Sequence, residues 1–528
     1  MALLRFSATV GGFTLASRVL GFARDMLIAS LLAAGPVADA FFVAFRIPNM
    51  FRRLVGEGAF AAAFVPMFAG RLERDGRPAA LRFAEEVLSV LLSTMLLTLV
   101  VAEAAMPWLM VAIAPGFVGD AVHGGADAGA NQFALAVSLT RLCFPYLLFM
   151  ALAALFGGAL NAFYRFSAPA AAPILLNVVL IAFLLAAGDI LETPGHALAW
   201  GVAAAGVGQF LWLVLAGARA GISLRLPRPR LTPDVRRLLA LMLPGALGAG
   251  VHQINLLVST AIASFQAGAV SYLYYADRIN QLPLGVVGVA VGVALLPLLS
   301  RQVKAGREAD ALASQNRAIE LALLLTLPAT AALVAIPSAI VSTLFERGSF
   351  GAAEARATAD ALAAFAAGLP AYVLVKVLSP GFFAREDMKA PVKIAVAALV
   401  ANIVLCLVLV QPLGHVGIAL ATALASWLNA VLLALVLLRR RHLVPDQRLR
   451  RRGPRMAGAA AALGAGLAAA AWGLEGALSG SLGARLGALA LLVLGGLALY
   501  GALARLLGAV EFGELRLLMR RPGAGAAT

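Results

Sequence analysis

Charged residues are scarce in this sequence. Only 13% of its 528 residues are Asp, Glu, Lys or Arg, about half the share of a soluble domain, whereas 62% are hydrophobic. The mean hydropathy is +0.92. This composition excludes a soluble globular domain, a disordered chain and a disulfide scaffold. No stretch is polar enough for a separate soluble domain, so the sequence predicts an all-α polytopic membrane protein.

Cysteine and histidine are also scarce. The two cysteines, Cys143 and Cys406, lie in separate apolar runs, and there are five histidines. We therefore expect two buried thiols rather than a disulfide or a thiolate metal site. The sequence has no metal-ligand spacing and no paired-carboxylate loop motif. It predicts neither a metal nor a cofactor, and it argues against an integral membrane enzyme such as a glycosyltransferase.

Apolar windows of about 20 residues predict fourteen membrane spans. They lie near residues 7–32, 37–70, 84–114, 132–157, 169–188, 196–217, 238–264, 271–299, 318–337, 358–382, 394–411, 415–438, 456–475 and 484–508. The second window is too long for one straight crossing and contains Pro48, so we expect a kinked or irregular helix there.

Basic residues are distributed unevenly between the loops. The two termini and the loops after even-numbered spans hold thirty of the 42 Lys and Arg residues, whereas the loops after odd-numbered spans hold Arg347, Arg356 and Arg485. Because cytoplasmic loops carry such an excess, both termini are predicted to be cytoplasmic. The densest run, Arg439–Arg455, is interpreted as an orienting loop. A lipid headgroup patch is the alternative, and nucleic acid is not an expected partner.

Two short motifs recur along the chain. AFRIPNM (44–50) resembles ADRINQL (276–282), and FGGALNAFYRFSAP (156–169) matches LSPGFFAREDMKAP (378–391) in length and closing Ala-Pro. They predict that spans 1–6 and 7–12 are repeats related by an axis along the membrane normal, a transporter architecture. The expected parts are an N-lobe at 1–220, a C-lobe at 221–440, a basic cytoplasmic loop at 441–455, an added pair of spans at 456–508 and a cytoplasmic tail at 509–528.

Several charged residues remain in or near the predicted spans, although a charge at the bilayer centre costs at least ~2.5–3.5 kcal/mol. The basic ones are Arg18, Arg24, Arg46, Arg52, Arg53, Arg141, Arg278, Lys376 and Arg505. The acidic ones are Asp25, Asp39, Glu57, Glu103 and Asp277. Seven-residue spacings place Arg18 with Asp25, and Asp39 with Arg46 and Arg53, on shared helix faces.

Cations outnumber acids in this set, so structural ion pairs cannot neutralise all of it. The residues assigned to ion pairs or gating are Asp25, Asp39, Arg46, Arg53, Glu57 and Asp277. We predict that Asp39 pairs with a cavity arginine in one of two access states. The surplus guanidinium groups suit phosphate and carboxylate oxygens, so the expected substrate is an anion. A cation-exporting antiporter would need the opposite surplus. Asn255 and Asn402 are candidates for an ion site, with the membrane potential as an equal energy source.

The segment SRVLGFARDMLIASLLAAGPVADAFFVAFRIPNMFRRLVGEGAFAAAFVPMF (17–68) closely resembles the MurJ (MviN) lipid II flippase family of the MOP exporter superfamily. YYADRINQLPLGVVGVA (274–290) is similar to that family's eighth span. The resemblance implies an inner-membrane protein that moves the undecaprenyl-diphosphate-linked peptidoglycan precursor, lipid II, from the cytoplasmic to the periplasmic leaflet.

The same resemblance implies roles for particular residues. The substrate-binding positions are Arg18, Arg24, Arg52 and Arg278, and the last two spans would form a groove for the polyprenyl tail. Besides lipid II and membrane lipids, the cell-wall synthesis machinery is a candidate partner. A flippase for another polyprenyl-linked glycan is the alternative function, and a drug or ion antiporter of the same superfamily is a more distant one.

The predicted topology can be tested with single cysteines. Cysteines placed in 120–128 and 340–350 are expected to react with a membrane-impermeant maleimide added to whole cells. Cysteines placed in 220–232 and 442–454 are expected to react only after the membrane is opened. External labelling of either cytoplasmic segment would contradict the fourteen-span arrangement.

Overall fold

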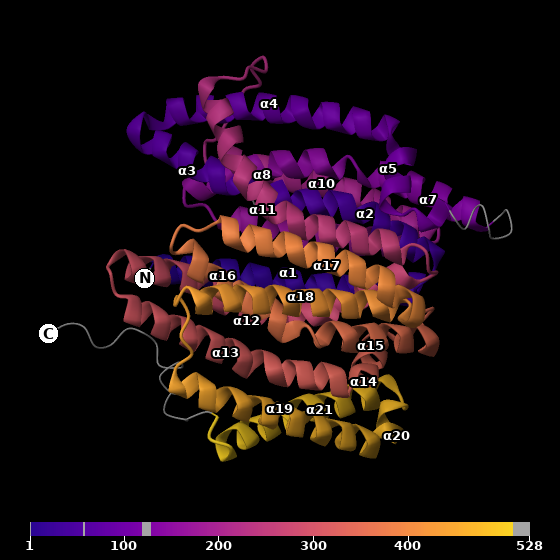
Figure 1. Cartoon of the computed structure of the whole chain (residues 1–528). Coiled ribbons are helices and arrows are strands. Elements are labelled where there is room, and N and C mark those ends of the chain that lie inside the picture. Colours follow the sequence, from indigo (N-terminus) through magenta and orange to yellow (C-terminus); the bar gives the residue numbers. More distant parts are fainter. Residues whose placement is uncertain (1, 56–58, 119–127, 510–528) are drawn as a thin grey trace. The chain divides into compact units, whose positions relative to one another are not determined.

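The structure is a computed structural model of the chain, and it describes residues 2–55, 59–118 and 128–509. Within these ranges the regular structure is α-helical, apart from one isolated bridge between Arg347 and Phe350. The helices are α1 (Ala2–Leu32), α2 (Pro36–Val55), α3 (Ala59–Arg74), α4 (Gly76–Ala104), α5 (Met106–Ile113), α7 (Ala128–Cys143), α8 (Tyr146–Ala162), α9 (Ser167–Ala187), α10 (Pro194–Arg219), α11 (Pro233–Ala263), α12 (Ala269–Lys304), α13 (Glu308–Ala335), α14 (Pro337–Phe345), α15 (Ala352–Ala366), α16 (Leu369–Phe383), α17 (Lys389–Leu413), α18 (His415–Arg439), α19 (Gln447–Gly473), α20 (Glu475–Leu478) and α21 (Leu482–Leu506). Figure 1 labels all of them except α9.

Each predicted window falls on one of these helices or on a tandem pair such as α7 and α8. In the described chain, 10 helical segments are long and apolar enough to cross a membrane. The windows at 7–32, 37–70, 238–264 and 271–299 are also helical but are not among them. Three of those four windows hold charges that the sequence places inside spans. The protein is therefore an all-α multi-pass membrane protein, and its helices are consistent with fourteen spans.

The window at 37–70 contains α2, with Pro48 inside it, and α3, and residues 56–58 between them lie outside the described residues, so the expected kink stays a prediction. Another local expectation differs from the structure. The segment 441–455, predicted as a loop, is helical from Gln447 onward. The cause is Asp446, whose side chain accepts a hydrogen bond from the Leu449 backbone N–H at 2.7 Å and so caps α19.

The chain forms two compact units, which are described separately. The first comprises the described residues up to Tyr274 together with Arg347–Gly351, and the second comprises the rest. The short return segment belongs to the first unit because the Ser349 N–H donates to the Ser30 carbonyl at the end of α1, at 2.8 Å. The adjacent Gly348 has a φ of +58°, and a Cβ there would clash with the same carbonyl. The boundary between the two units falls inside α12, and the repeats at spans 1–6 and 7–12 stay a prediction.

Aromatic packing joins α3, α4 and α8 in the first unit. Phe64 is fully buried, and its ring lies 5.2 Å from that of Phe60 and 5.8 Å from that of Phe83. A Cβ on Gly158 of α8 would lie 2.9 Å from the Phe64 ring. Between membrane helices, close packing replaces the hydrophobic effect as the stabilising force, and small residues permit it. Gly158 is such a residue.

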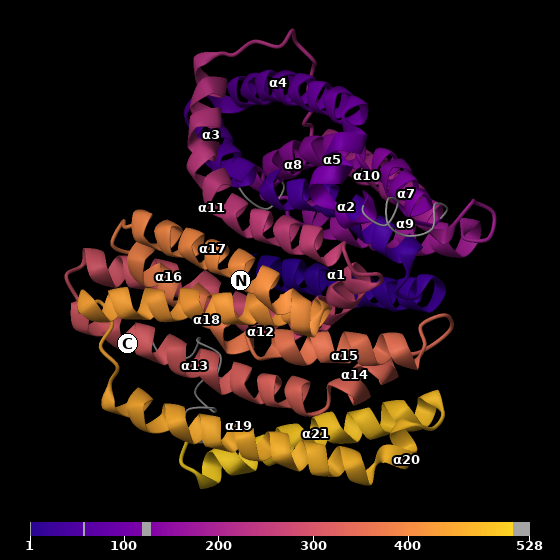
Figure 2. The same ribbon diagram turned by 45° about the vertical axis from the view of Figure 1, so that its right-hand side comes forward.

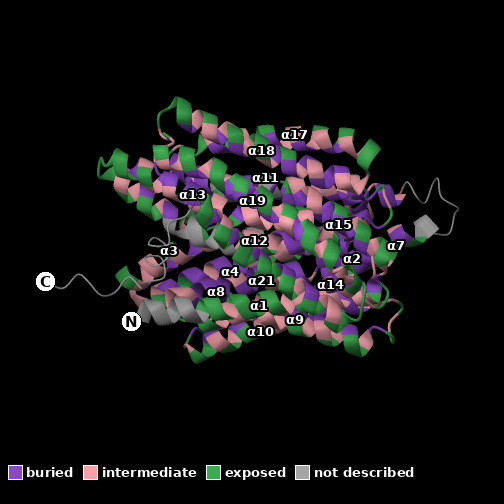
Figure 3. Cartoon of the chain, turned by 90° about the horizontal axis from the view of Figure 1, so that it is seen from below, coloured by how far each residue is buried: buried purple, intermediate pink, exposed green. Residues whose placement is uncertain are grey.

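In the second unit, α17 shows which surface meets lipid. Its buried residues form a single stripe at helical spacing: Pro391, Ala398, Asn402 and Cys406. The remaining residues are exposed or half-buried, and Figure 3 colours most of α17 green or pink. Cys406 and Cys143 are both buried free thiols, which confirms the sequence prediction.

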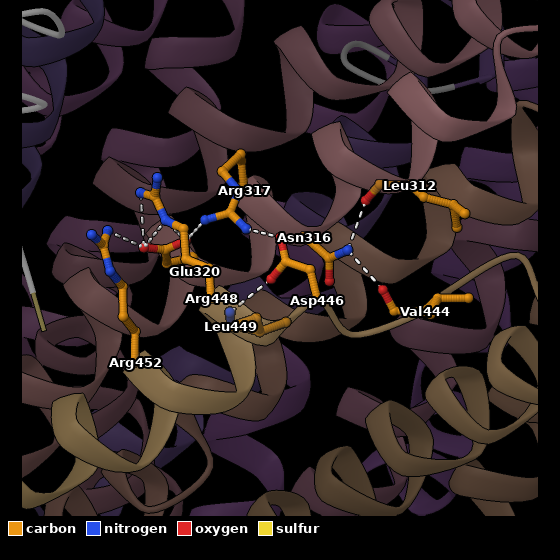
Figure 4. Close-up of polar contacts among 9 residues, drawn as sticks. All are labelled: Leu312, Asn316, Arg317, Glu320, Val444, Asp446, Arg448, Leu449 and Arg452. Carbon is orange, nitrogen blue, oxygen red and sulfur yellow. Dashed lines mark hydrogen bonds and ion pairs between the residues drawn. The ribbon is translucent and has the colours of Figure 1, made fainter.

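A cluster of charges attaches α19 to α13 (Figure 4). Glu320 on α13 is only 6% exposed and accepts hydrogen bonds from three arginines. The Arg448 Nε lies 3.0 Å from Oε2, the Arg452 Nη1 lies 2.9 Å from Oε1, and Arg317 on α13 completes the set. The sequence predicts a loop at Arg448 and Arg452, and Glu320 is not among the embedded acids that it predicts, because Glu320 lies at the edge of the apolar window at 318–337.

Further contacts extend this attachment. Asp446 binds Arg317, and the Asn316 side-chain amide donates to the Val444 carbonyl at 2.8 Å (Figure 4). At the opposite end of these helices, the Arg485 Nη1 on α21 lies 3.4 Å from the Glu346 Oε1, directly after α14. Figure 2 shows α19 and α21 side by side. The last two long helices are therefore attached to α13 and α14 at both ends.

Asp446 keeps this attachment charged at physiological pH. Burial raises the pKa of its carboxyl, but the Leu449 N–H and the Arg317 guanidinium outweigh burial, so the pKa lies below its usual 3.8. A carboxyl with a lowered folded-state pKa adds stability above its unfolded-state pKa, and this is lost as the pH falls through the folded value. The contribution of Asp446 is therefore complete at neutral pH and is lost only below pH 3.8.

Removing the Glu320 carboxylate should loosen α19 from α13. We expect Glu320→Ala to lower stability by about 3 kcal/mol, since it leaves several guanidinium groups without their acid. The midpoint of thermal unfolding in detergent measures the effect. Glu475→Ala, on exposed Glu475 of α20, is the matched control and should leave the midpoint unchanged. Equal midpoints for the two variants would show that the cluster does not stabilise the fold.

Candidate functional site

A buried ion pair lies in the C-terminal half of α1 in the first unit. Arg24 is 5% exposed and Asp25 is 2% exposed, and the Arg24 Nη2 lies 2.6 Å from the Asp25 Oδ1. The Arg24 Nη1 donates to the Asn177 Oδ1 on α9 at 3.0 Å, and the Asn177 amide donates to the Ser17 carbonyl at 2.9 Å. These bonds tie α1 to α9 through charge and amide groups.

Tyr274 completes this network from the first turns of α12. Its hydroxyl donates to the Asp25 Oδ1 at 3.2 Å, and its ring stacks on Phe42 of α2 with centroids 3.8 Å apart. A buried charge pair is stable only when further hydrogen bonds satisfy its remaining donors and acceptors. Asn177 and Tyr274 supply them. The guanidinium of Arg24 is therefore held by protein groups in this conformation, and its contact with a substrate stays a prediction.

Arg18 has a different environment from Asp25, despite the seven-residue spacing. Arg18 is exposed, whereas Asp25 is buried. On α2, Arg46 and Arg52 are half-buried, and the Arg52 Nε donates to the Asn49 Oδ1 at 3.2 Å. Only the helix backbone is described at Arg53. Glu57 lies outside the described residues.

Asp39 binds the start of α12. One oxygen, Oδ2, accepts from the Gly268 N–H at 2.9 Å. The other, Oδ1, accepts from the Ser271 N–H at 2.8 Å and from the Ser271 hydroxyl at 2.5 Å. The first N–H groups of a helix lack partners within the helix and carry partial positive charge. A carboxylate from α2 therefore caps α12. The predicted pairing of Asp39 with an arginine is not the arrangement of this conformation and stays a prediction for another.

In the second unit, the charges on α12 lie one helical turn past Tyr274. Asp277 and Arg278 are both half-buried, and the Gln281 side chain donates to the Asp277 Oδ2. Of the two asparagines proposed for an ion site, Asn402 is buried on α17 of the second unit, while Asn255 is half-buried on α11 of the first.

The neutral partners of the embedded charges were not predicted from the sequence. Asn177 is the one amide side chain in the window at 169–188, and a lone amide in an apolar span is a signal that it meets another polar group. Gly268 acts through its backbone N–H, and Ser271 through its N–H and its hydroxyl, and their contact with Asp39 spans more than 200 residues of sequence. No spacing within one helix could reveal that contact.

The sequence matches the family model described as "Lipid II flippase MurJ" over residues 28–477. It is 47% identical to the probable lipid II flippase MurJ of Rhizobium tropici over 528 residues, which cover 99% of this chain and 97% of that protein. It is 40% identical to the lipid II flippase MurJ of Burkholderia cenocepacia over 446 residues, covering 83% of this chain and 84% of that protein.

Solved structures share the fold. A lipid II flippase MurJ in an inward closed conformation superposes with a TM-score of 0.77 and 22% sequence identity, covering 98% of this chain and 100% of that chain. An inward-facing multidrug resistance MATE family transporter of the MOP superfamily matches with a TM-score of 0.65 and 15% identity, covering 81% of this chain and 94% of that chain. At these identities the likeness is one of fold.

The cap on α12 can be tested by hydrogen exchange. Asp39→Ala removes both acceptor oxygens, so the backbone amides of 268–271 should exchange faster, with a loss of about 0.5–2 kcal/mol of protection. Asp39→Asn should have a smaller effect, because its amide keeps one acceptor oxygen. Asp360→Asn, an exposed acid on α15, is the control. If Asp39→Ala leaves exchange at 268–271 unchanged, Asp39 does not hold the start of α12.

Proposed function

This chain belongs to the lipid II flippase MurJ family, and we propose that it transfers lipid II from the cytoplasmic to the periplasmic leaflet of the bacterial inner membrane. The observation that carries this proposal is 47% identity to a probable lipid II flippase over nearly the full length of both proteins. The transfer forms and breaks no covalent bond, so the chain acts as a transporter and not as an enzyme. Both termini lie in the cytoplasm, and the cell-wall synthesis machinery receives the product.

We propose that arginines bind the anionic headgroup. Arg18 is exposed, and Arg52 and Arg278 are half-buried, so each can reach a ligand without unfolding its helix. A guanidinium group presents a planar fork of donors that matches the oxygens of a diphosphate or a carboxylate. The apolar tail would remain in hydrocarbon throughout and would lie along α19 and α21.

Arg24 acts differently in this proposal. Because it is bonded to Asp25 and Asn177, it can contact the diphosphate only after exchanging those partners. An incoming phosphate would compete with the Asp25 carboxylate for the same donors. Binding would therefore alter the contacts between α1, α9 and Tyr274, which links substrate recognition to a change of conformation.

Asp39 is proposed to control the start of α12. This helix runs from the first unit into the second, and its first turn is fixed by a carboxylate from α2. Releasing that turn would change the conformation at the point where the chain passes between units. Arg46, Arg53, Glu57 and Asp277 are proposed to exchange ion pairs as access alternates.

Two other functions are considered as alternatives to lipid II transfer. A flippase for another polyprenyl-linked glycan would bind the same diphosphate and tail and would differ only at the sugar and peptide. A drug or ion antiporter shares the fold, but the surplus of embedded cations over acids argues against a cationic substrate. Asn255 and Asn402 remain the proposed sodium ligands if transport is ion-coupled, with the membrane potential as the other energy source.

The decisive experiment follows the lipid II headgroup. In cells depleted of the protein, labelled lipid II should stay inaccessible from the periplasm, and restoring the protein should return it to the outer leaflet. Normal exposure of lipid II with a different lipid-linked glycan retained inside would support the glycan alternative instead.

Arg278→Ala is expected to abolish complementation of a depletion strain while leaving the protein folded and inserted. One charged hydrogen bond contributes roughly 1.5–3 kcal/mol, so about ten- to 150-fold of lipid II affinity is at stake. Arg278→Lys should restore function only in part, since lysine keeps the charge and loses the planar fork.

Asp39→Asn is the contrasting variant for this test. It should bind lipid II in detergent within severalfold of the wild type and yet stop net transfer, because it changes the gate and not the anion site. Normal complementation by Arg278→Ala would remove Arg278 from the binding site. Equal loss of binding in both variants would place Asp39 in that site as well.

A further inference from the structure

Arg141 is an embedded cation that the proposed transport mechanism does not use. It lies near the end of α7 in the first unit, and its side chain is 49% exposed. It lines a pocket of about 520 Å³ between α5 and α7. The other walls are mostly apolar and include Pro107 on α5 with Phe133, Val137 and Leu142 on α7. A half-exposed guanidinium in an apolar pocket requires a partner for its donors.

The surroundings of this pocket are those of a lipid-facing surface. Leu97, Val100 and Val101 on α4 are exposed, as is Trp108 on α5. Glu103, which pairs with Arg141, is the last but one residue of α4, and the 29 residues of this helix span about 44 Å at 1.5 Å per residue. The hydrocarbon core is about 30 Å thick, and tryptophan favours its interface with the headgroups. Arg141 thus lies within reach of the headgroups on the predicted periplasmic side.

Glu103 satisfies Arg141 only in part. The closest approach of the pair is 3.9 Å, from the Arg141 Nε to the Glu103 Oε2, which is beyond hydrogen-bond distance. Glu103 is itself 32% exposed. A guanidinium group has five N–H donors, and in an environment poor in water these donors need acceptors close by. A phosphodiester supplies two acceptor oxygens and the compensating negative charge.

We propose that this pocket binds an anionic phospholipid of the outer leaflet. Its phosphodiester would accept hydrogen bonds from the Arg141 guanidinium, and an acyl chain would pack along Phe133, Val137 and Leu142. Two features select this occupant over others. Val101 and Trp108, which lie within two residues of Glu103 and Pro107, are exposed and apolar. Glu103 is too distant to accept a hydrogen bond from the guanidinium, which favours an anionic headgroup over a zwitterionic one.

The proposal predicts opposite effects for the two members of the ion pair. Arg141→Ala should weaken binding of phosphatidylglycerol about tenfold or more, because the charged hydrogen bonds to phosphate are lost. Arg141→Lys should weaken it less. Glu103→Gln should strengthen it, because the competing carboxylate is gone and Arg141 remains. If the pair were only structural, both changes would destabilise the protein and neither would raise lipid affinity.

Native mass spectrometry of the full-length protein in detergent measures the outcome, with titration of phosphatidylglycerol or phosphatidylcholine. The wild type should retain phosphatidylglycerol more tightly than phosphatidylcholine. Arg356→Ala is the control, since it removes an exposed arginine on the same predicted side of the membrane, on α15. Equal binding of the two lipids by the wild type would overturn the proposal. So would unchanged phosphatidylglycerol binding in Arg141→Ala, or weaker binding in Glu103→Gln.

Discussion

The cost of placing a charge in hydrocarbon governs this structure. Each embedded charge that the structure places well inside the protein is met by groups of opposite sign or by oriented dipoles. Asp25 receives a guanidinium and a phenol, Glu320 receives three guanidinium groups, and Asp39 receives the N–H groups of a helix start. Removing one partner leaves the other charge buried and uncompensated, which lowers the stability of the fold strongly. These contacts therefore determine which helices lie together. Lipid-facing packing alone would leave that choice weakly determined.

Embedded charges have two roles in this protein: some join helices, and others are proposed to bind the substrate. The Glu320 cluster joins helices within the second unit and has short, multiple contacts, which suits a permanent attachment. The contacts of Arg24 and Asp39 in the first unit involve groups that another anion or a water molecule could replace one at a time. Arg18 is exposed, and Arg52 and Arg278 are half-buried. Of the arginines proposed to bind the substrate, only Arg24 is buried, and it would have to exchange its protein partners first.

Hydropathy predicted the helices because the membrane requires every backbone group to be bonded within its own span. The all-α fold and the position of each window follow from that requirement. Hydropathy did not separate the short helix α5 from α4, because both lie in the one apolar window at 84–114, and it did not predict α14 and α20 as separate helices. The start of α19 was missed for a related reason. Its first turns are basic, and a capping carboxylate three residues upstream of Leu449, not hydropathy, sets where the helix begins.

The candidate site was only half accessible from the sequence. A charged residue inside an apolar window is visible in the sequence, so Arg24, Asp25 and Asp39 could be predicted as candidate site residues. Their partners could not, because Asn177, Tyr274 and the Gly268 N–H are neutral groups brought close by tertiary structure. The Glu320 cluster shows the complementary failure. Arg448 and Arg452 were counted as signals of orientation, whereas they also neutralise an acid that lies more than 120 residues earlier in the chain.

That separation has a consequence for biogenesis. The ribosome delivers α13 to the membrane long before α19 exists, so Glu320 must enter without Arg448 and Arg452. Its local companion is Arg317, one turn earlier on the same helix, which can accompany it through insertion as an ion pair within one helix. The later arrival of α19 would then convert a provisional pair into the finished cluster. Because α13 is synthesised before α19, Arg317 is the residue that neutralises Glu320 until α19 is inserted.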